Sequence, residues 1–517
     1  MSPRKTLAIE VLLLLVVLAA MAYVYADAAR LSWTYDDAFL LRVADSADLN
    51  DYFGSRPFWR SMPSKLFVPL LLAWYELGSR AGGAEGFYVL AIALLVIALA
   101  ACYVALRRFF GPVESLAGIA LIGLGPPVVS LVTQLMATHY LIALAFAALA
   151  VAAFARGWNV LSAIFYLAAM LAKEIAIPLP VLLLFLPQSR PRRLIPHAIA
   201  LVLYFAWRKI LLGVFVGGYG WAVTRDNAGA LLASLPRQLA LALTPSSTVL
   251  AILLALVLLI PIALRLRSRD FALAFVVALI CAIAPVLPVA RELQPRYAFA
   301  TWLTLVVFFV IAVRANAIVC VVAVIVAFLA HRAEWRDVWP LAQQMSDETR
   351  FVLRAPADAT LRLPKTPPAA MGELQWLRAR DGVPPMQWFY DDLYVCHGRH
   401  RGRRVFESTA NGIAQVNVDA VARNCGAIRD NAPLRADFRF DEGTLHWIFG
   451  PYERGSYRVV FGDGVQAFTV PREDAYILGD IPGIALRVRY EAPEGWVTYS
   501  PELALDFVRR PNMQWRR

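Results

Sequence analysis

The sequence predicts a polytopic α-helical membrane protein that ends in a soluble, strand-rich α+β domain, and three observations predict it. The chain has 517 residues, of which 59% are hydrophobic and only 17% are charged, whereas soluble domains average about 25% charged residues. Apolar runs of about 20 residues, the length that crosses a bilayer, recur in the first two thirds of the chain. They stop near residue 331, after which Gly, Pro and charges of both signs return.

The charge divides at the same boundary. Residues 1–332 contain 26 Lys and Arg against 14 Asp and Glu, whereas residues 333–517 contain 24 of each class. The net charge of +12 therefore belongs to the apolar part. A nucleic-acid-binding protein would carry a clustered basic face on a soluble domain, so this distribution argues against nucleic acid and favours charges that set membrane topology.

Hydropathy predicts about eleven transmembrane helices. With the N-terminus in the cytoplasm, every predicted inner loop contains Lys or Arg, as the resistance of positive residues to translocation requires. The first helix is then a retained anchor, and both the long first loop and the C-terminal domain lie outside. The predicted spans are 7–25, 87–106, 113–135, 138–155, 158–172, 175–188, 194–214, 247–264, 271–290, 296–313 and 315–331.

The predicted domains follow from these spans. Residues 1–331 form the transmembrane domain, and its first outer loop, 26–86, includes a helix near Lys65–Leu77 that lies in the membrane interface. Residues 332–370 form a helix and a Pro-rich connector, and residues 371–517 a β-rich domain. Strands are expected at 443–449, 456–461, 465–470 and 485–490. Cys396 and Cys425 can form one disulfide if this domain is in an oxidising compartment.

Two adjacent carboxylates, Asp36 and Asp37, follow the first predicted helix. A carboxylate pair at the mouth of a helical bundle is costly to desolvate, which favours a functional role. One carboxylate can act as a general base on a hydroxyl, while the other orients a substrate or holds a divalent cation. The alternative is an acidic loop that is simply solvated.

Residues 35–44 read Tyr-Asp-Asp-Ala-Phe-Leu-Leu-Arg-Val-Ala, which resembles the first-loop signature of GT-C glycosyltransferases. These polytopic enzymes take sugars from polyprenyl-phosphate carriers. The likeness is greatest to a bacterial branch in which Asp-Asp-Ala-Phe/Tyr precedes two or three apolar residues and Arg-Tyr-Ala. Val43 replaces the usual aromatic residue, and the Gly-rich continuation is poorly matched near residues 51–55. The resemblance implies that Asp36 or Asp37 is the catalytic base.

Three basic residues are the candidates for binding the donor phosphate. By the same resemblance, Lys173, Arg296 and Arg208 would meet the phosphate of the lipid carrier. Each has a structural alternative: a self-neutralising pair of Lys173 with its neighbour, an interfacial anchor at Arg296, and snorkelling of Arg208. The predicted accessory residues are Arg42, Glu174 and Tyr297. Three other polar sites receive structural interpretations, namely His139 as a helix-start group, Glu10 as a helix-packing contact and Asp391/Asp392 as a turn.

The resemblance therefore implies an inverting glycosyltransferase in a bacterial inner membrane, with a periplasmic C-terminal domain. Its partners would be a polyprenyl-phosphate-linked sugar, the lipid bilayer, and a hydroxyl of a cell-envelope glycan, lipid or protein. No cofactor is required, although Asp36 and Asp37 could hold a divalent cation. Two alternatives stay open: a transporter or flippase of lipid-linked sugars, and a non-catalytic envelope-assembly protein. The sequence leaves the sugar, the acceptor, the linkage and the choice between the two aspartates open.

Overall fold

The computed structural model describes residues 3–62, 66–187, 189–215, 235–243, 246–286, 294–314, 316–363, 371–409, 412–441, 444–477, 483–506 and 514–515. The chain divides into two compact units, Met1–Gln343 and Gln344–Arg517. The first unit is helical and the second is rich in strands, as the sequence predicts. The two units are described one after the other.

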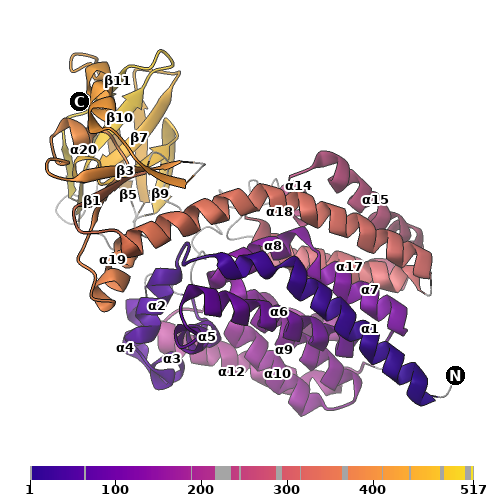
Figure 1. The fold of residues 1–517 in the computed structure, drawn as a ribbon. Coiled ribbons are helices and arrows are strands. Elements are labelled where there is room, and N and C mark those ends of the chain that lie inside the picture. The colour runs from indigo at the N-terminus through magenta and orange to yellow at the C-terminus, as the bar shows by residue number, and fades with distance from the viewer. Residues whose placement is uncertain are drawn as a thin grey trace. The chain divides into compact units, whose positions relative to one another are not determined.

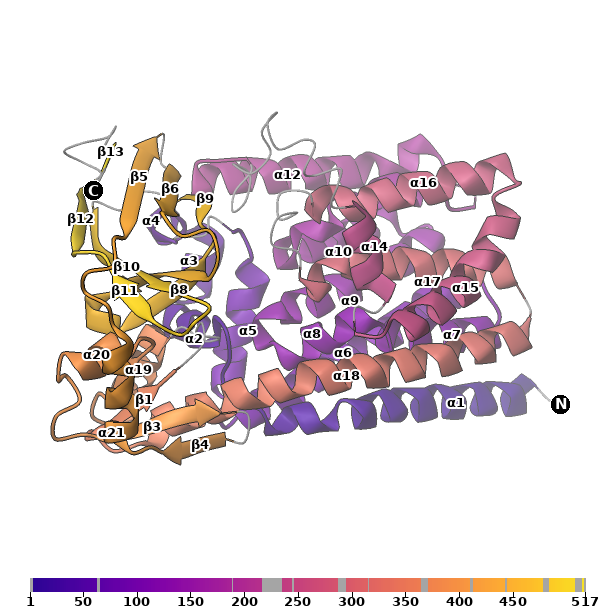
Figure 2. The same ribbon diagram turned by 90° about the horizontal axis from the view of Figure 1, so that it is seen from above.

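Unit 1 contains eight helical segments, among the described residues, that are long and apolar enough to cross a membrane. In Figures 1 and 2 most of them run alongside one another as a bundle. The segments are α1 (Pro3–Val24), α6 (Ala84–Leu106), η2 and α9 (Leu135–Ala155), η4 and α12 (Pro191–Leu212), α15 (Thr248–Arg265), α16 (Arg269–Ile283), which continues to Val286, η8 and α17 (Pro295–Val313), and α18 (Ala317–Arg354).

Burial divides these helices into two kinds. More than half of α6, α9 and α17 is buried within the unit, whereas only 11–17% of the spans formed by α1, α15 and α16 is buried. The exposed residues are large and apolar, for example Leu12, Val249 and Ile280. Apolar surface of this extent is unfavourable in water, and a helix satisfies its own backbone hydrogen bonds in lipid. The outer helices are therefore suited to contact acyl chains.

The predicted span 113–135 is broken. Helices α7 (Pro112–Gly123) and α8 (Pro126–Thr133) meet at an angle of 57°. Pro126 and Pro127 cannot donate backbone hydrogen bonds, which explains the break. Gly125 is needed here because a Cβ atom at this position would lie 2.1 Å from Nε1 of Trp302, which donates to the Leu121 carbonyl at 3.1 Å.

The predicted spans 158–172 and 175–188 appear as shorter elements. They are α10 (Asn159–Ala172), η3 (Glu174–Ala176) and α11 (Leu179–Leu183). Counting the bent pair as one span gives up to nine candidate spans in the described part of the chain. The total of about eleven stays a prediction.

The first loop folds into short helices that pack against the bundle. They are η1 (Ala26–Arg30), α2 (Asp37–Asp45), α3 (Leu49–Gly54), α4 (Arg56–Ser61) and α5 (Pro69–Ser79). Asp48 begins α3 with a capping box that Asp51 completes, and Ser55 caps α4. Helix α5 covers most of the predicted interfacial segment, and Leu71, Leu72 and Tyr75 on it are buried. The predicted outer loop at 215–246 lies largely outside the described residues, apart from α14 (Leu235–Leu243).

The described residues of unit 2 form three sheets, with strand orders β2-β1-β3-β4, β11-β10-β7-β8 with β12 also pairing β10, and β13-β5-β6-β9. The last two sheets are antiparallel, and β6, β7, β8 and β10 confirm the four predicted strands. The strands are β1 (Ala359–Arg362), β2 (Gln387–Phe389), β3 (Arg404–Thr409), β4 (Gly412–Gln415), β5 (Arg435–Asp441), β6 (Thr444–Gly450), β7 (Ser456–Phe461), β8 (Gln466–Val470), β9 (Glu473–Ile477), β10 (Gly483–Glu491), β11 (Val497–Tyr499), β12 (Leu503–Asp506) and β13 (Gln514–Trp515).

The first of these sheets was not predicted. In it, β1 pairs in parallel with both β2 and β3. Parallel neighbours need a connection that returns to the same end of the sheet. Along the chain, helix α19 (Met371–Arg380) connects β1 to β2, and α20 (Leu393–Cys396) is in the connection from β2 to β3.

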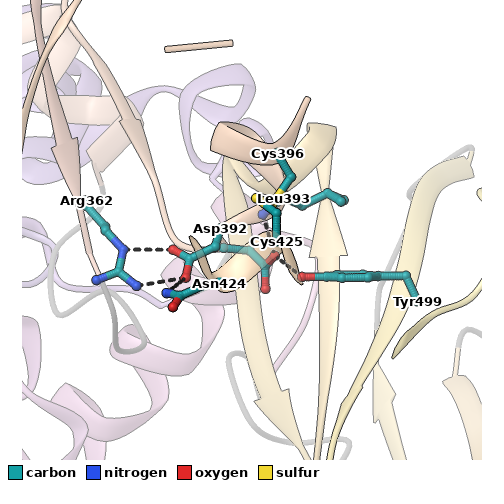
Figure 3. The surroundings of a disulfide bond; sticks show 8 residues. Arg362, Asp392, Leu393, Cys396, Asn424, Cys425 and Tyr499 are labelled. Atoms are coloured by element: carbon teal, nitrogen blue, oxygen red, sulfur yellow. Dashed lines mark hydrogen bonds and ion pairs between the residues drawn. A yellow bond between two sulfur atoms is a disulfide. The ribbon is translucent and has the colours of Figure 1, made fainter. Parts of the chain in front are cut away.

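A disulfide joins Cys396 at the end of α20 to Cys425 in η9 (Arg423–Ala427), as Figure 3 shows. Beside it, Arg362 donates two hydrogen bonds to the carboxylate of Asp392, at 2.8 and 2.9 Å. The same carboxylate accepts a hydrogen bond from Asn424 at 2.8 Å. The disulfide and the carboxylate therefore tie strand β1, helix α20 and η9 together.

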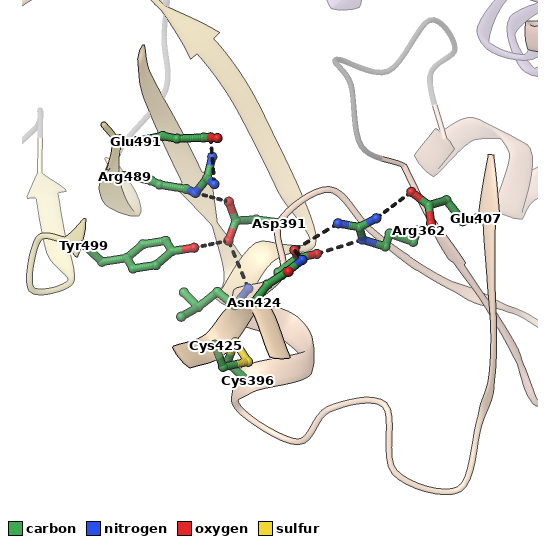
Figure 4. A network of polar contacts seen from close by, with 11 residues as sticks. Arg362, Asp391, Cys396, Glu407, Asn424, Cys425, Arg489, Glu491 and Tyr499 are labelled. Carbon is green, nitrogen blue, oxygen red and sulfur yellow. Dashed lines mark hydrogen bonds and ion pairs between the residues drawn. A yellow bond between two sulfur atoms is a disulfide. The ribbon is translucent and has the colours of Figure 1, made fainter. Parts of the chain in front are cut away.

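Asp391, next in the chain, points into a second network (Figure 4). This buried carboxylate accepts hydrogen bonds from the Tyr499 hydroxyl at 2.5 Å and the Leu393 N–H at 3.0 Å. It also pairs with Arg489 of β10, whose Nε lies 3.3 Å away, and Arg489 pairs with Glu491. The aspartate pair predicted as a turn is thus a structural link, with one carboxylate bonded to each neighbouring sheet.

Replacing Cys396 by Ser should destabilise unit 2. The disulfide closes a loop of 29 residues, so its loss should cost about 3–4 kcal/mol through the entropy of the unfolded chain. The measurement is the urea concentration at which trypsin cleaves unit 2 in the purified full-length protein. Cys281→Ser, at a cysteine without a disulfide in α16, is the control and should leave that concentration unchanged. Equal resistance of the Cys396→Ser protein would contradict the prediction.

Candidate active site

Asp37 is fully buried at the start of α2 and accepts hydrogen bonds from three elements. The Thr34 N–H, in the chain before α2, donates to Oδ2 at 2.7 Å. The Tyr75 hydroxyl of α5 donates to Oδ1 at 2.6 Å, and the Met136 N–H of η2 donates to the same oxygen at 3.1 Å. One carboxyl group thus joins the first loop to the helix break before α9.

The backbone gives the two neighbouring aspartates opposite surroundings. Tyr35 has a φ of +47°, in the left-handed region that aromatic residues rarely adopt. The resulting turn, in which the Asp37 N–H donates to the Thr34 carbonyl at 3.0 Å, buries Asp37 and leaves Asp36 exposed. Backbone strain of this kind gathers at functional sites.

Asp36 has the properties of a proton acceptor. It occupies the N-cap position of α2, yet its side chain makes no capping hydrogen bond. Surrounding protein raises the pKa of Asp36, and the positive charge of Arg296 counteracts part of that rise. Burial raises the pKa of Asp37 to about 7, against the opposing hydrogen bonds from Tyr75 and Thr34. Asp37 is therefore held by the protein, whereas Asp36 is open to a ligand.

Arg296 lies at the start of η8 and α17 and is buried. Its Nη1 donates to the side-chain oxygen of Gln134 at 2.5 Å and lies 3.8 Å from the Met136 sulfur. The guanidinium also lies 5.1 Å from the ring centroid of Tyr297, and its Nη2 is 3.4 Å from that residue's hydroxyl. These contacts hold the cation of Arg296 close enough to Asp36 for their charges to interact.

The partner of Glu174 is Arg208, in α12, rather than Lys173. Arg208 is buried and donates to both Glu174 and the Tyr204 hydroxyl. The interpretation of Lys173 and Glu174 as a self-neutralising pair is therefore wrong. Arg208, which was predicted to bind phosphate, instead forms this ion pair with Glu174.

Lys173 consequently has no ion-pair partner among the described residues. Its Nζ lies 5.2 Å from the ring centroid of Tyr140 and, within the described residues, forms no hydrogen bond or ion pair. It keeps partial exposure to solvent. Burial lowers the pKa of Lys173, Glu174 raises it, and the positive charges of Arg296 and Arg208 lower it further.

Sequence analysis missed the residues that join this site together. Met136 donates its N–H to Asp37, accepts a hydrogen bond at its carbonyl from Nδ1 of His139 at 2.6 Å, and places its sulfur beside Arg296. His139 was interpreted only as a helix-start group, and Gln134 was not considered. A signal was present, because Gln134 and His139 are polar residues inside an apolar run, where polar side chains tend to be functional.

The remaining predicted residues lie at varying distances from this centre. Tyr297 contacts Arg296 as described, whereas Arg42 is exposed, with its guanidinium 5.8 Å from the Phe39 ring centroid. Glu10 pairs with Arg107 and Tyr103 of α6, which supports its interpretation as a helix-packing contact. Among the described residues, no group of three or more His, Cys, Asp and Glu side chains is arranged to hold a metal ion.

No family model and no curated protein sequence matches this chain.

The stability of the protein should fall as pH rises from about 4 to 7. Asp37 titrates near 7 in the folded protein and near 3.8 in the unfolded chain, so between these values the folded state holds a proton that the unfolded state has lost. Linkage then lowers the free energy of unfolding with pH, by on the order of 4 kcal/mol in total, and leaves it flat above 7. Thermal unfolding midpoints between pH 4.5 and 8 test this. Asp37→Asn should flatten the profile, whereas Asp45→Asn, at the exposed end of α2, should not.

Glu174→Gln should destabilise unit 1, because it leaves the buried charge of Arg208 without its partner. Breaking a buried ion pair costs about 3–5 kcal/mol, and about 2–3 kcal/mol is expected here because Glu174 is partly exposed. The matched control is Glu76→Gln, which breaks the ion pair of Glu76 with Arg80, an arginine that is exposed where Arg208 is buried; this change should cost less than about 1 kcal/mol. Replacing Glu174 and Arg208 together by Leu should recover most of the loss in the detergent-unfolding midpoint. Equal midpoints for the two single variants would refute the assignment.

Proposed function

We propose that this protein is a GT-C-like membrane glycosyltransferase that moves a sugar from a polyprenyl-phosphate carrier to a hydroxyl group. The observation that carries the proposal is the gathering of one open carboxylate and two cations in one site. Asp36 is exposed to a ligand, Arg296 acts electrostatically on it, and Lys173 lacks an ion-pair partner among the described residues. A base next to a phosphate-binding pair is what this reaction requires.

In the proposed reaction, Asp36 removes the proton of the acceptor hydroxyl while the oxygen of that hydroxyl attacks the anomeric carbon of the donor. The bond between that carbon and the phosphate oxygen breaks on the opposite face, which inverts the configuration. The departing electron pair stays on the carrier phosphate. Lys173 and Arg296 stabilise the charge that develops there, and the proton remains on Asp36 until solvent removes it.

The other polar residues of the site have supporting roles in this proposal. Asp37 holds the turn that presents Asp36, through its bonds to Thr34, Tyr75 and Met136. Glu174 and Arg208 neutralise each other, which fixes the turn that presents Lys173. Of the three basic residues suggested by the resemblance, Arg208 is thus proposed to position the site rather than to contact phosphate.

We place the site and unit 2 outside the cytoplasm of a bacterial inner membrane. The basic inner loops support this orientation. The Cys396–Cys425 disulfide supports it as well, because disulfides persist in oxidising compartments. A polyprenyl carrier would then approach from the outer leaflet.

A second candidate is a transporter of lipid-linked sugars, and the broken helix α7–α8 favours it. Discontinuous helices are typical of transporter binding sites; this pair bends by 57° near Gly125, and its second helix, α8, ends just before Gln134. A second break, between α8 and α9, serves the glycosyltransferase proposal, because Met136 donates its N–H to Asp37 there.

Asp36→Asn should abolish sugar transfer while leaving the fold intact. Loss of a positioned general base lowers rates by about 10²–10⁴-fold, and the exposed side chain makes no capping hydrogen bond. The assay follows a radiolabelled sugar from the polyprenyl-phosphate pool into envelope glycan, in membranes with equal amounts of protein. Asp45→Asn is the control and should retain wild-type transfer.

Binding of the carrier separates the two candidates further. Asp36→Asn should still bind polyprenyl phosphate, whereas Lys173→Gln and Arg296→Gln should bind it at least tenfold more weakly, as expected for lost charge-assisted hydrogen bonds. Unchanged transfer in Asp36→Asn, together with carrier flipping that depends on the protein, would replace the enzyme proposal by the transporter.

A further inference from the structure

His139, a residue of the site that the proposed function does not use, has a ring nitrogen without a hydrogen-bond partner among the described residues. His139, at the start of α9, is only 7% exposed. Within the described residues, its Nε2 is buried and forms no hydrogen bond. Buried polar atoms without a partner are rare and call for a cause.

The other ring nitrogen shows which chemistry Nε2 can perform. Nδ1 lies 2.6 Å from the Met136 carbonyl oxygen. A carbonyl only accepts, so Nδ1 must carry a hydrogen and donate. In the neutral imidazole Nε2 then holds a lone pair and is an acceptor.

The groups facing the ring favour that neutral form. Lys173, from the turn between α10 and η3, and Arg296, from η8, both act electrostatically on His139. Two positive charges beside the ring disfavour a third. The Tyr140 ring contacts both groups. Its centroid lies 4.7 Å from the centroid of the His139 ring and 5.2 Å from Nζ of Lys173.

A hydrogen-bond acceptor beside two cations matches a ligand with a hydroxyl next to a phosphate. A sugar linked to phosphate through its anomeric carbon has this pattern, since its nearest hydroxyl is on the adjoining carbon. We propose that His139 Nε2 accepts a hydrogen bond from a hydroxyl of the donor sugar while Lys173 and Arg296 hold the phosphate. This inference rests on the proposed function and deepens it.

The consequence is discrimination between donor and product. Both the glycosylated carrier and the bare carrier phosphate offer oxygens to Lys173 and Arg296. Only the glycosylated carrier offers a hydroxyl to His139, so it gains a hydrogen bond to Nε2 that the bare carrier cannot make and should bind more tightly. His139 is therefore a specificity-determining residue that favours exchange of product for new donor.

A second histidine provides the control. His197 in α12 also has one bonded nitrogen, Nε2, 2.8 Å from the Ser162 hydroxyl, and one buried nitrogen without a partner, Nδ1, among the described residues. No charged group of the site acts on it. It lies eleven residues before Arg208 on the same helix, or about 16 Å along the axis. His197→Gln, whose terminal amide can retain the bond to Ser162, should leave carrier binding unchanged.

The test compares two variants, each of which retains the hydrogen-bonding function of one of the two ring nitrogens. His139→Asn retains a donor for the Met136 carbonyl but removes the atom at Nε2. His139→Gln places an amide oxygen near the Nε2 position. Purified full-length protein in lipid nanodiscs is titrated with bare polyprenyl phosphate and with polyprenyl phosphates carrying glucose, mannose, galactose or arabinose. Wild type should prefer at least one glycosylated carrier, and His139→Asn should reduce that preference about tenfold, the value of one lost hydrogen bond. His139→Gln should retain part of it.

The other outcomes overturn the inference in distinguishable ways. If His139→Asn weakens the binding of the bare and the glycosylated carrier equally, the residue stabilises the fold or contributes to phosphate binding. If His139→Asn keeps the wild-type preference, or if wild type prefers no glycosylated carrier, Nε2 does not form a hydrogen bond with the sugar. If bare polyprenyl phosphate fails to bind, or binds regardless of Lys173→Gln, the proposed donor class itself is wrong, and the assignment of His139 is overturned with it.

Discussion

The hydrogen bonds to Asp37 are the constraint on which the site depends. A membrane protein must satisfy every backbone N–H that leaves a regular helix, and the break between α8 and α9 releases that of Met136. Asp37 accepts it, together with Thr34 N–H and the Tyr75 hydroxyl. The same carboxyl thus closes the helix break and orients the turn that exposes Asp36. One buried group therefore supports both the fold and the turn, and under the proposed function the second aspartate is the one left for the reaction.

The distribution of charge in the candidate site depends on which basic residue pairs with Glu174. Glu174 is next to Lys173 in the chain, yet it pairs with Arg208 on α12. The planar guanidinium of Arg208, held also by Tyr204, is the better partner for a desolvated carboxylate. Among the described residues, Lys173 is thereby left without an ion pair, and it interacts electrostatically with Arg296 and with the ring of His139. In the proposed function, this choice of partner for Glu174 is what leaves the ammonium of Lys173 available to an anion.

Much of the architecture was predictable because long apolar helices and alternating strands are local patterns. The Asp36–Asp37 pair was found for the same reason, since adjacent residues need no knowledge of the fold. The different surroundings of the two aspartates were not predictable, because they depend on the left-handed backbone of Tyr35 and on donors 38 and 99 residues away in the chain. The partner of Glu174 lies 34 residues away and was missed on the same grounds. The bend at Gly125 was visible in the sequence as Gly-Pro-Pro, but a hydropathy average passes over it.

The unbalanced charge of Lys173 has a practical consequence for handling the protein. The positive charges of Lys173 and Arg296 repel each other, and an anionic group bound near both would reduce that repulsion. Any ligand that binds only the folded state stabilises it by mass action. Detergent extraction that strips acidic lipids would remove such ligands. Purification in the presence of an anionic lipid should therefore give a longer-lived sample than purification in neutral detergent alone.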